Sequence, residues 1–167
     1  MPGYRVRSRD GVLGDPEIRP AIAADAAILS SLAFRSKAHW GYSIEFMAAC
    51  KSELTYTTAI IEAPQFHFHV CEIDNQIAGF YALEILDAHS AGLEALFVIP
   101  GLIGNGIGKA MIAHCRAVAT RLGVQTIDIQ GDPNAEEFYL AVGALTCGYR
   151  ESLSIPGRQL PVFRITL

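Results

Sequence analysis

The stretch that most restricts the fold is residues 91–122, which combines a strand, a glycine-rich turn and a helix. The run "AGLEALFVIP" is apolar and ends at Pro100, as a buried strand would. Four glycines then fall between Gly101 and Gly108. Beyond them, apolar residues recur at helical spacing, namely Ile107, Met111, Cys115, Val118 and Leu122. A strand that leads directly into an amphipathic helix predicts a sheet with helices packed against it.

The segments on either side extend this pattern into a mixed sheet. "EIRPAI" predicts a short strand, and two helices are expected to begin at the N-caps Asp25 and Ser43. "QFHFHVCEI" and "IAGFYALEIL" alternate around "DNQ" and predict a hairpin. A strand, a short helix and two final strands follow residue 123. We therefore expect an α/β (α+β) fold, with a mixed, mostly antiparallel central sheet flanked by about four helices.

Length and charge limit the number of domains and the classes of partner. The chain has 167 residues, which suits one domain. We assign that domain to residues 17–167, after a flexible N-terminal segment over residues 1–16. The formal net charge is −4, which provides no overall field for a nucleic-acid backbone. No apolar run indicates a membrane span or a signal peptide, and the scattered cysteines read as reduced thiols, so we expect a cytoplasmic protein.

The glycine turn has the chemistry of an anion site. Backbone N–H groups at a helix N-terminus are unpaired, the helix dipole adds positive potential, and glycines let a phosphate approach closely. Lys109 would add a full charge, although a simple tight turn would also use glycines. A Walker loop, GxxxxGK[ST], fails at Ile103 and Ala110, and the dinucleotide spacing GxGxxG fails at Lys109.

A third phosphate-binding spacing fits the turn. "VIPGLIGNGIGKAM" resembles motif A of the GCN5-related N-acetyltransferase (GNAT) superfamily, written [QR]xxGx[GA] after a strand that ends in Val-x-Pro. Ile103 stands where the family usually has Gln or Arg. The matching positions are Val98, Pro100, Gly106 and Gly108, with Gly104 where a glycine is common.

A second motif extends the resemblance toward the C-terminus. "IQGDPNAEEFYLAVGA" resembles motif B of the family, in which an Asn lies near a strand end and a Tyr follows on a short helix. Ala144 replaces the frequent Phe. The corresponding residues are Asn134, Phe138, Tyr139 and Gly143. The resemblance as a whole spans roughly residues 17–167.

The resemblance implies a sheet splayed between its fourth and fifth strands, here 91–99 and 124–130, with acetyl-CoA bound in the gap. Pantetheine would pair with the free edge of "ALFVI", and a main-chain N–H near Phe97 or Val98 would stabilise the oxyanion. No metal is implied. The pyrophosphate would contact the turn and helix start, at Ile103, Gly104, Asn105, Gly106, Ile107, Gly108 and Lys109.

The resemblance also suggests the acid–base groups. Tyr139 would be the general acid, because a phenol of pKa about 10 can pass a proton to a thiolate; the alternative is a core aromatic. Asn134 would bind the pantetheine arm, cap the helix, or do both. The general base is open between Glu94, which also fits an ordinary solvated strand position, Glu84 and an ordered water.

Aromatic residues between the first two helices point to the acceptor side. His39, Trp40 and Tyr42 would line a substrate pocket, although Trp40 would equally anchor the helix pair in the core.

Histidines elsewhere are given structural roles. His67, His69 and Cys71 share one face of a strand, but no fourth ligand has suitable spacing, so a solvated face is expected rather than a metal site. His114 lies beside the apolar stripe of its helix and is expected to be packed.

We therefore expect an acyltransferase that moves an acetyl group from acetyl-CoA to a primary amine of a small molecule, by direct attack in a ternary complex. The alternatives are transfer to a protein or peptide amine, and a non-catalytic acyl-CoA-binding sensor domain. No nucleic-acid or membrane partner is expected. The sequence leaves open the acceptor, the use of longer acyl groups, and whether a homodimer forms, as is common in the family.

Overall fold

The predicted hairpin at residues 66–85 lies within a larger sheet in the computed structural model, which describes residues 7–8 and 11–167. Within those residues the main sheet has seven strands in the order β3-β4-β5-β6-β7-β9-β8. Neighbours are antiparallel except β6 and β7, which are parallel. The strands are β3 (Glu17–Pro20), β4 (Phe66–Ile73), β5 (Gln76–Ile85), β6 (Ser90–Val98), β7 (Thr126–Gln130), β8 (Leu145–Glu151) and β9 (Gln159–Thr166).

Five α-helices occur in the described residues, where about four were expected. The additional one is α3, whose five residues are too few to show a helical period in the sequence. The predicted cap Ser43 is confirmed, since its hydroxyl accepts the N–H of Phe46 at 3.1 Å. The helices are α1 (Ala26–Ala38), α2 (Ile44–Cys50), α3 (Thr58–Glu62), α4 (Ile107–Arg121) and α5 (Glu136–Ala141). Short 3-10 turns are η1 (Ala23–Asp25), η2 (Pro100–Leu102) and η3 (Pro133–Ala135).

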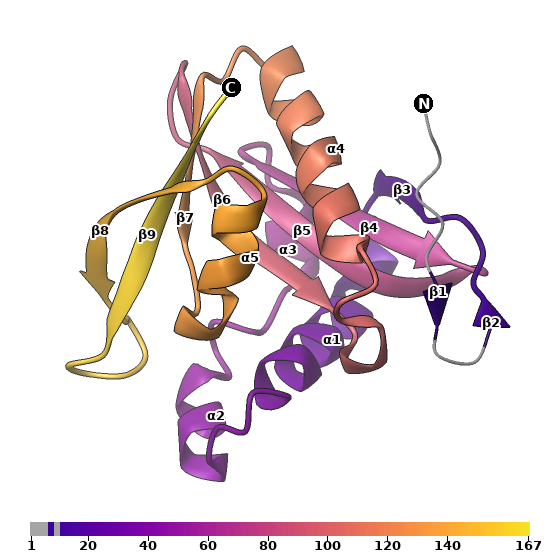
Figure 1. Ribbon diagram of the computed structural model, residues 1–167, viewed down its shortest axis with the longest axis horizontal. Coiled ribbons are helices and arrows are strands. Elements are labelled where there is room, and N and C mark those ends of the chain that lie inside the picture. The colour runs from indigo at the N-terminus through magenta and orange to yellow at the C-terminus, as the bar shows by residue number, and fades with distance from the viewer. Residues whose placement is uncertain (1–6, 9–10) are drawn as a thin grey trace.

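Helices cover both faces of the sheet and so create two cores (Figure 1). One core lies under α4 and α5 and includes the fully buried Met111 and Phe163. The other lies under α1, α2 and α3 and includes Leu29, Leu32 and Phe80. Because both faces are covered, the central strands are apolar on both sides, and the predicted mixed α/β sheet is confirmed.

The sheet opens between β6 and β7. Their parallel pairing begins at Ser90 and ends where Leu93 faces Ile129, although β6 continues to Val98. On the other side, β6 stays paired with β5, but its register shifts by one residue at Glu94. This β-bulge bends β6 away from β7, and the predicted splay between the fourth and fifth strands is confirmed.

The bulge also changes which face the side chains of β6 occupy. Ala91 and Leu93, before the bulge, belong to the core under α4 and α5. Ala95 and Phe97, after it, pack into the core under α1 to α3. Period-two alternation would have kept all four on one face, so the extra residue at Glu94 inverts the pattern.

The N-terminal expectations need two adjustments. Within the segment expected to be flexible, β1 (Arg7–Ser8) and β2 (Gly11–Val12) pair antiparallel, while residues 1–6 and 9–10 lie outside the described residues. Asp25 does not cap α1 with its side chain. Instead its carboxylate accepts the N–H of Ile22 at 2.9 Å and pairs with Arg19 at 2.9 Å. Burial opposes ionisation of Asp25, but these donors outweigh it and lower its pKa.

The solvated face predicted for β4 is wrong, because α4 covers part of it. Cys71 is fully buried, and the ring of His69 stacks on Tyr81 with centroids 5.1 Å apart. His114 on α4 is packed as predicted, and its Nδ1 lies 2.9 Å from the Tyr81 hydroxyl. The Nδ1 of His69 is buried and lacks a hydrogen-bond partner among the described residues.

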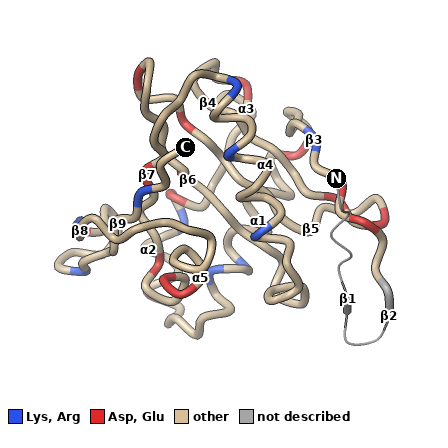
Figure 2. Tube along the Cα trace, turned by 45° about the horizontal axis from the view of Figure 1, so that its top comes forward, with Lys and Arg blue, Asp and Glu red and all other residues tan. Residues whose placement is uncertain are grey.

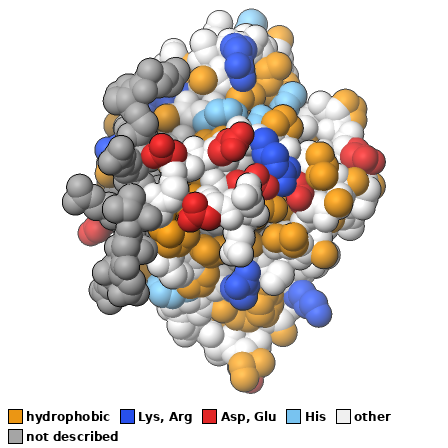
Figure 3. Space-filling model, turned by 90° about the vertical axis from the view of Figure 1, so that its right-hand side faces the viewer, with side chains coloured by type: hydrophobic (Ala, Val, Ile, Leu, Met, Phe, Trp, Pro, Cys, Tyr) orange, Lys and Arg blue, Asp and Glu red, His pale blue; other side chains and the backbone are white. Residues whose placement is uncertain are grey.

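Charged residues are spread over the whole fold. Lys and Arg are interspersed with Asp and Glu along the chain (Figure 2), and the face in Figure 3 mixes acidic, basic and histidine side chains. None of the helices in the described ranges is long and apolar enough to cross a membrane.

The buried position of His69 predicts acid sensitivity. Burial, with smaller effects of His114 and His67, lowers the pKa of His69 from 6.5 to about 4. Below pH 6.5 the unfolded chain binds a proton that the folded chain excludes, so stability falls with pH down to about 4. Because the ring is only half-buried, solvent screens part of this effect, and we expect His69→Phe to remove about 1–2 kcal/mol of the loss, measured by urea unfolding at about pH 7 and about pH 4.5.

The exposed His89 provides the control, since His89→Phe should leave the pH dependence of the free energy of unfolding unchanged. A parent-like pH dependence in His69→Phe would assign the acid sensitivity to other groups.

Candidate functional site

The start of α4 presents a group of free backbone donors. The N–H of Asn105 donates to the carbonyl of Leu102 at 3.3 Å, so it is not one of these free donors. Ile107 has its side chain in the core, which leaves only its N–H available. Among the described residues, no acceptor pairs with the N–H groups of Gly104, Gly106, Ile107, Gly108 and Lys109. Their number and the helix dipole make this an anion site.

Glycine is required at this turn for two different reasons. Gly104 and Gly106 have φ of +85° and +86°, a left-handed conformation that side chains disfavour. A Cβ at either position would meet nothing of the protein within 4 Å, so the space above them is open to a ligand. At Gly108, by contrast, a Cβ would lie 3.1 Å from the ring of Phe138, which packs α5 against α4.

The open edge of β6 presents further free backbone groups. The N–H of Ile99 donates to Ala78 on β5 at 2.9 Å, and alternation directs the N–H of Phe97 to β5 as well. The oxyanion donor expected near Phe97 or Val98 therefore cannot be the N–H of Phe97. Leu96 and Val98 point their N–H and C=O groups to the side that β7 has left.

A cavity of about 790 Å³ passes through this opening from one face of the sheet to the other. On the α4 side its wall includes Ile103, Lys109 and Tyr139. On the α1 side it includes Trp40 and Tyr56. Val98 and Glu94 lie between the two ends, on β6. The gap in the sheet thus joins the anion site to a second compartment.

Tyr139 combines a packed ring with an available hydroxyl. The ring contacts Phe163, at 5.3 Å between centroids, and lies over Gly131, where a Cβ would be 3.1 Å away. The side chain lines the cavity, so its hydroxyl is open to a bound ligand. Burial, with a smaller effect of Asp132, raises the pKa of the phenol, so its proton is retained at working pH.

Glu94 lies in the cavity wall at the bulge. Partial burial and the nearby carboxylate of Glu84 raise its pKa, whereas Arg150 opposes the shift. A carboxylate with a raised pKa is a better general base near neutral pH. The hydroxyl of Tyr56 is close by, since burial and then the charges of Glu94 and Glu53 raise the Tyr56 pKa.

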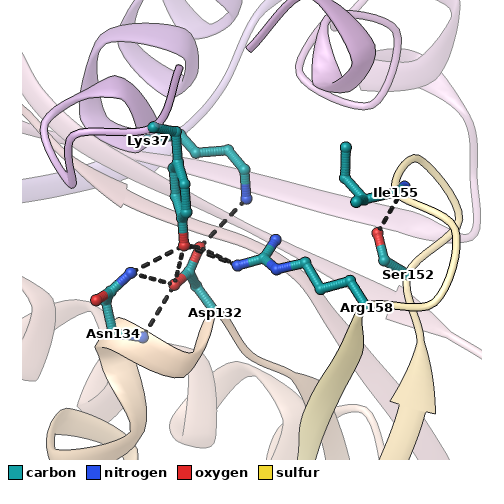
Figure 4. A network of polar contacts seen from close by, with 7 residues as sticks. Lys37, Asp132, Asn134, Ser152, Ile155 and Arg158 are labelled. Atoms are coloured by element: carbon teal, nitrogen blue, oxygen red, sulfur yellow. Dashed lines mark hydrogen bonds and ion pairs between the residues drawn. The ribbon is translucent and has the colours of Figure 1, made fainter. Parts of the chain in front are cut away.

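A polar network centred on Asp132 joins three separate segments (Figure 4). The Tyr42 hydroxyl donates to the Asp132 carboxylate at 2.8 Å, and Arg158 from the β8–β9 loop donates to that hydroxyl at 2.7 Å. Lys37 of α1 lies 3.3 Å from the same carboxylate. Burial opposes ionisation of Asp132, but the N–H of Asn134, the Tyr42 hydroxyl and Lys37 lower its pKa.

The same network corrects the capping role considered for Asn134. Asp132 is the cap of η3, since its carboxylate accepts the N–H of Asn134 at 2.9 Å. The side-chain amide of Asn134 donates to Tyr42 at 2.8 Å and to Asp132 at 2.9 Å, and the residue lines the cavity.

The three aromatic residues predicted to line the substrate pocket have different positions in the structure. Trp40 is 41% exposed and lines the cavity, so it does not anchor the helix pair in the core. Tyr42 was also expected in the pocket, but it is not part of the cavity wall. Asp132 accepts a hydrogen bond from its hydroxyl, and its ring stacks on Phe46 with centroids 4.1 Å apart. His39 contacts Trp40 edge-on but does not reach the cavity wall.

Several site residues were missed by sequence reasoning. Tyr56, Asp132 and Arg158 come from connections between elements, where no periodicity marks them. The "GDPN" turn carried the signal for Asp132, because an Asp before Pro is a common helix cap.

An anion site beside an unpaired strand edge is the arrangement of an acyl-CoA-dependent acyltransferase, in which one region binds the phosphates and the other the acyl arm. Residues 33–144 match the model of the acetyltransferase (GNAT) family. The chain belongs to that family and is an acyltransferase that uses acetyl-CoA. No curated protein matches it in sequence.

Solved structures share the whole fold at low identity. The PaiA N-acetyltransferase of Thermoplasma acidophilum, solved with coenzyme A, is 19% identical with a TM-score of 0.76, over 91% of this chain and 99% of that one. A GCN5-related N-acetyltransferase of Rhodopseudomonas palustris is 21% identical with a TM-score of 0.76, over 93% and 98%. A GNAT family acetyltransferase of Elizabethkingia anophelis, with acetyl-CoA bound, is 15% identical with a TM-score of 0.62, over 91% and 98%.

The turn geometry predicts how variants bind acetyl-CoA. Gly106→Val should weaken binding by about 100-fold or more, because it strains a left-handed position and fills the space above the free N–H groups. Lys109→Ala should weaken it only about 2- to 5-fold, since one exposed charge is lost. Calorimetric titration with acetyl-CoA measures both. Parent-like affinity in a folded Gly106→Val protein would place the cofactor elsewhere.

The network predicts a large stability difference between two aspartates. Asp132→Ala should cost about 2–4 kcal/mol, because it leaves Lys37 and Tyr42 without their shared acceptor. Asp128→Ala is the matched control, since Asp128 pairs with the half-exposed Arg164 and should cost less than about 1 kcal/mol. Urea unfolding gives both values; equal costs would mean that the network adds no stability.

Proposed function

We propose that the protein is an N-acetyltransferase that moves an acetyl group from acetyl-CoA to a primary amine of a small molecule, by direct attack in a ternary complex. The observation that carries the proposal is the cavity through the sheet. It lets donor and acceptor enter from opposite faces and meet at the β6–β7 gap, beside Glu94 and Tyr139. Neither substrate then has to leave before the other binds.

The residues present fit acetyl-CoA on the donor side. The free N–H groups at residues 104 and 106–109 match a pyrophosphate, and the open space over Gly104 and Gly106 admits it. Leu96 and Val98 offer a strand edge to the amides of the pantetheine arm. The Val98 N–H is our choice for the oxyanion donor, because it lies beyond the bulge on the open edge.

The acid and base lie on opposite faces. On the acceptor side, Glu94 takes a proton from the ammonium form of the substrate, directly or through a water. On the donor side, Tyr139 gives its phenolic proton to the leaving sulfur. Burial raises the phenol pKa, which by itself opposes release of the proton. The same environment disfavours a free thiolate, so the two effects offset each other and the proton can pass to sulfur.

The Asp132 network across the acceptor end favours a small acceptor over a peptide. The Asp132 network ties Tyr42, between α1 and α2, to Arg158 of the β8–β9 loop. These connections cover the acceptor end, where Trp40 and Leu153 also line the cavity. A peptide requires an open groove, whereas an amine of a few heavy atoms can enter beside this network.

The direct test is a screen of acetyl transfer from acetyl-CoA to monoamines, polyamines, amino acids and a lysine peptide, monitored by release of free thiol. We expect turnover with at least one small amine. Turnover with the peptide alone would move the acceptor to proteins, and acetyl-CoA binding without any turnover would favour a sensor domain.

Tyr139→Phe tests the proposed acid. Because the change removes only the hydroxyl and keeps the packed ring, the variant should keep its melting temperature and acetyl-CoA affinity while kcat falls about 100-fold or more. Phe138→Leu, which changes the neighbouring ring and leaves the acid intact, is the comparison. An unchanged kcat in Tyr139→Phe would remove the phenol from the mechanism.

A further inference from the structure

Two carboxylates of neighbouring strands lie on the acceptor face of the sheet. Glu84 on β5 is directly opposite Gly92 on β6. Glu94 follows Gly92 by two positions and is the extra residue of the bulge. Before the bulge, residues two apart share a face, and Gly92 alternates with Ala91 and Leu93, which face α4. Glu84 and Glu94 are therefore neighbours across the β5–β6 pair.

Gly92 provides the space that brings them together. A Cβ built on Gly92 would lie 2.5 Å from Oε1 of Glu94 and 3.6 Å from its Cδ. The carboxylate of Glu94 therefore lies over Gly92, on the side of Glu84. Gly92 is not among the residues with positive φ, so its backbone does not require glycine. A side chain at this position would displace the carboxylate of Glu94 from that space.

The surroundings determine how this pair titrates. Glu84 lies beside Glu94 on β5, and Arg150 from β8 is the nearby cation. Tyr56 and Glu53, from the connection between α2 and α3, line the same cavity as Glu94. The nearby carboxylate of Glu84 disfavours the charged form of Glu94 and adds to the rise in the Glu94 pKa that burial causes. Proton uptake at Glu94 therefore depends on Glu84.

We infer that Glu84 and Glu94, seated over Gly92, form one carboxylate pair that takes up the proton of the acceptor ammonium. This rests on the proposed function. The N–H bond of the ammonium breaks, an O–H bond forms on Glu94 and is shared with Glu84, and the neutral amine is left to attack. Glu94 is the group that meets the substrate. Glu84 and Gly92 are positioning residues, which act through its carboxylate.

Glu84→Gln tests the pair because it removes one charge and keeps the shape. Glu94 should then ionise more readily, so the acid limb of kcat/KM should move down by about one pH unit. Acetyl-CoA affinity should not change. Glu62→Gln, at the exposed end of α3, is the matched control and should leave the profile in place. An acid limb unmoved by Glu84→Gln would overturn the inference.

Gly92→Ala tests whether Glu94 must lie over Gly92, and it keeps both carboxylates. The methyl group displaces only the flexible end of Glu94, so the fold should survive while kcat falls about 10-fold or more. In a Glu94→Gln background the same change should have little further effect, because the displaced group is already inactive. Additive losses in the double variant would show that Gly92 does not act through Glu94.

A titration of the free protein separates this inference from the proposed function. The carboxyl carbon chemical shift of Glu94 should titrate above the ordinary Glu range, and Glu84→Gln should move that titration back toward the range. A Glu94 titration that Glu84→Gln does not change would overturn the pair whatever the acceptor is. A Glu94 titration that responds to Glu84→Gln, together with no amine acetylation, would instead overturn the proposed function and leave the pair standing.

Discussion

The backbone pairing between β6 and β7 stops at Leu93 and Ile129, and the site depends on that early end. Beyond it, β6 stays in the sheet through β5 alone, so Leu96 and Val98 have free polar groups in the middle of the molecule. Unpaired backbone groups in an interior are costly unless a ligand or water satisfies them. The gap between β6 and β7 therefore suits an extended ligand that has amide groups of its own. The same gap connects the two faces of the sheet.

Because of the bulge at Glu94, functional side chains lie on both faces of the sheet at this gap. By inverting the alternation of β6, the bulge places a carboxylate on the acceptor face one position after Leu93, which faces the donor-side core. Tyr139 approaches from the donor face on a helix that Gly108 and Gly131 allow to pack closely. Asp132 then ties the end of β7 to the two connections over the acceptor compartment. The proposed acid, the proposed base and the Asp132 network thus come from different layers and lie around the break in the sheet.

Much of this arrangement could be predicted from local patterns. The hairpin around Asp74 and Asn75, both with positive φ, and the helix after the glycine turn are visible because periodicity and turn chemistry are local. The anion-binding role of Gly104 and Gly106 follows from the same locality. Motif spacing likewise placed Tyr139 and Glu94 near the cavity.

Other features depend on contacts between distant elements and leave no mark on one stretch of sequence. His69 was expected in solvent because alternation does not reveal that α4 covers its face. The direction of the Phe97 N–H follows from the register with β5, which a single strand does not encode. Asp25 has the residue type of a cap, but Arg19 from β3 and the N–H of Ile22 hold its carboxylate. The role of Gly92 became visible only through the position of Glu94.

The interrupted strand has a consequence for how the backbone exchanges hydrogen with solvent. In β6 the amide of Ile99 is held by β5, whereas those of Leu96 and Val98 face the cavity. Alternate amides of one central strand should therefore exchange at rates typical of a sheet interior and of a sheet edge. The exchange rates of β6 therefore report whether a ligand fills the β6–β7 gap. A ligand that pairs with the open edge of β6 would slow the amides of Leu96 and Val98 to the rates of their neighbours.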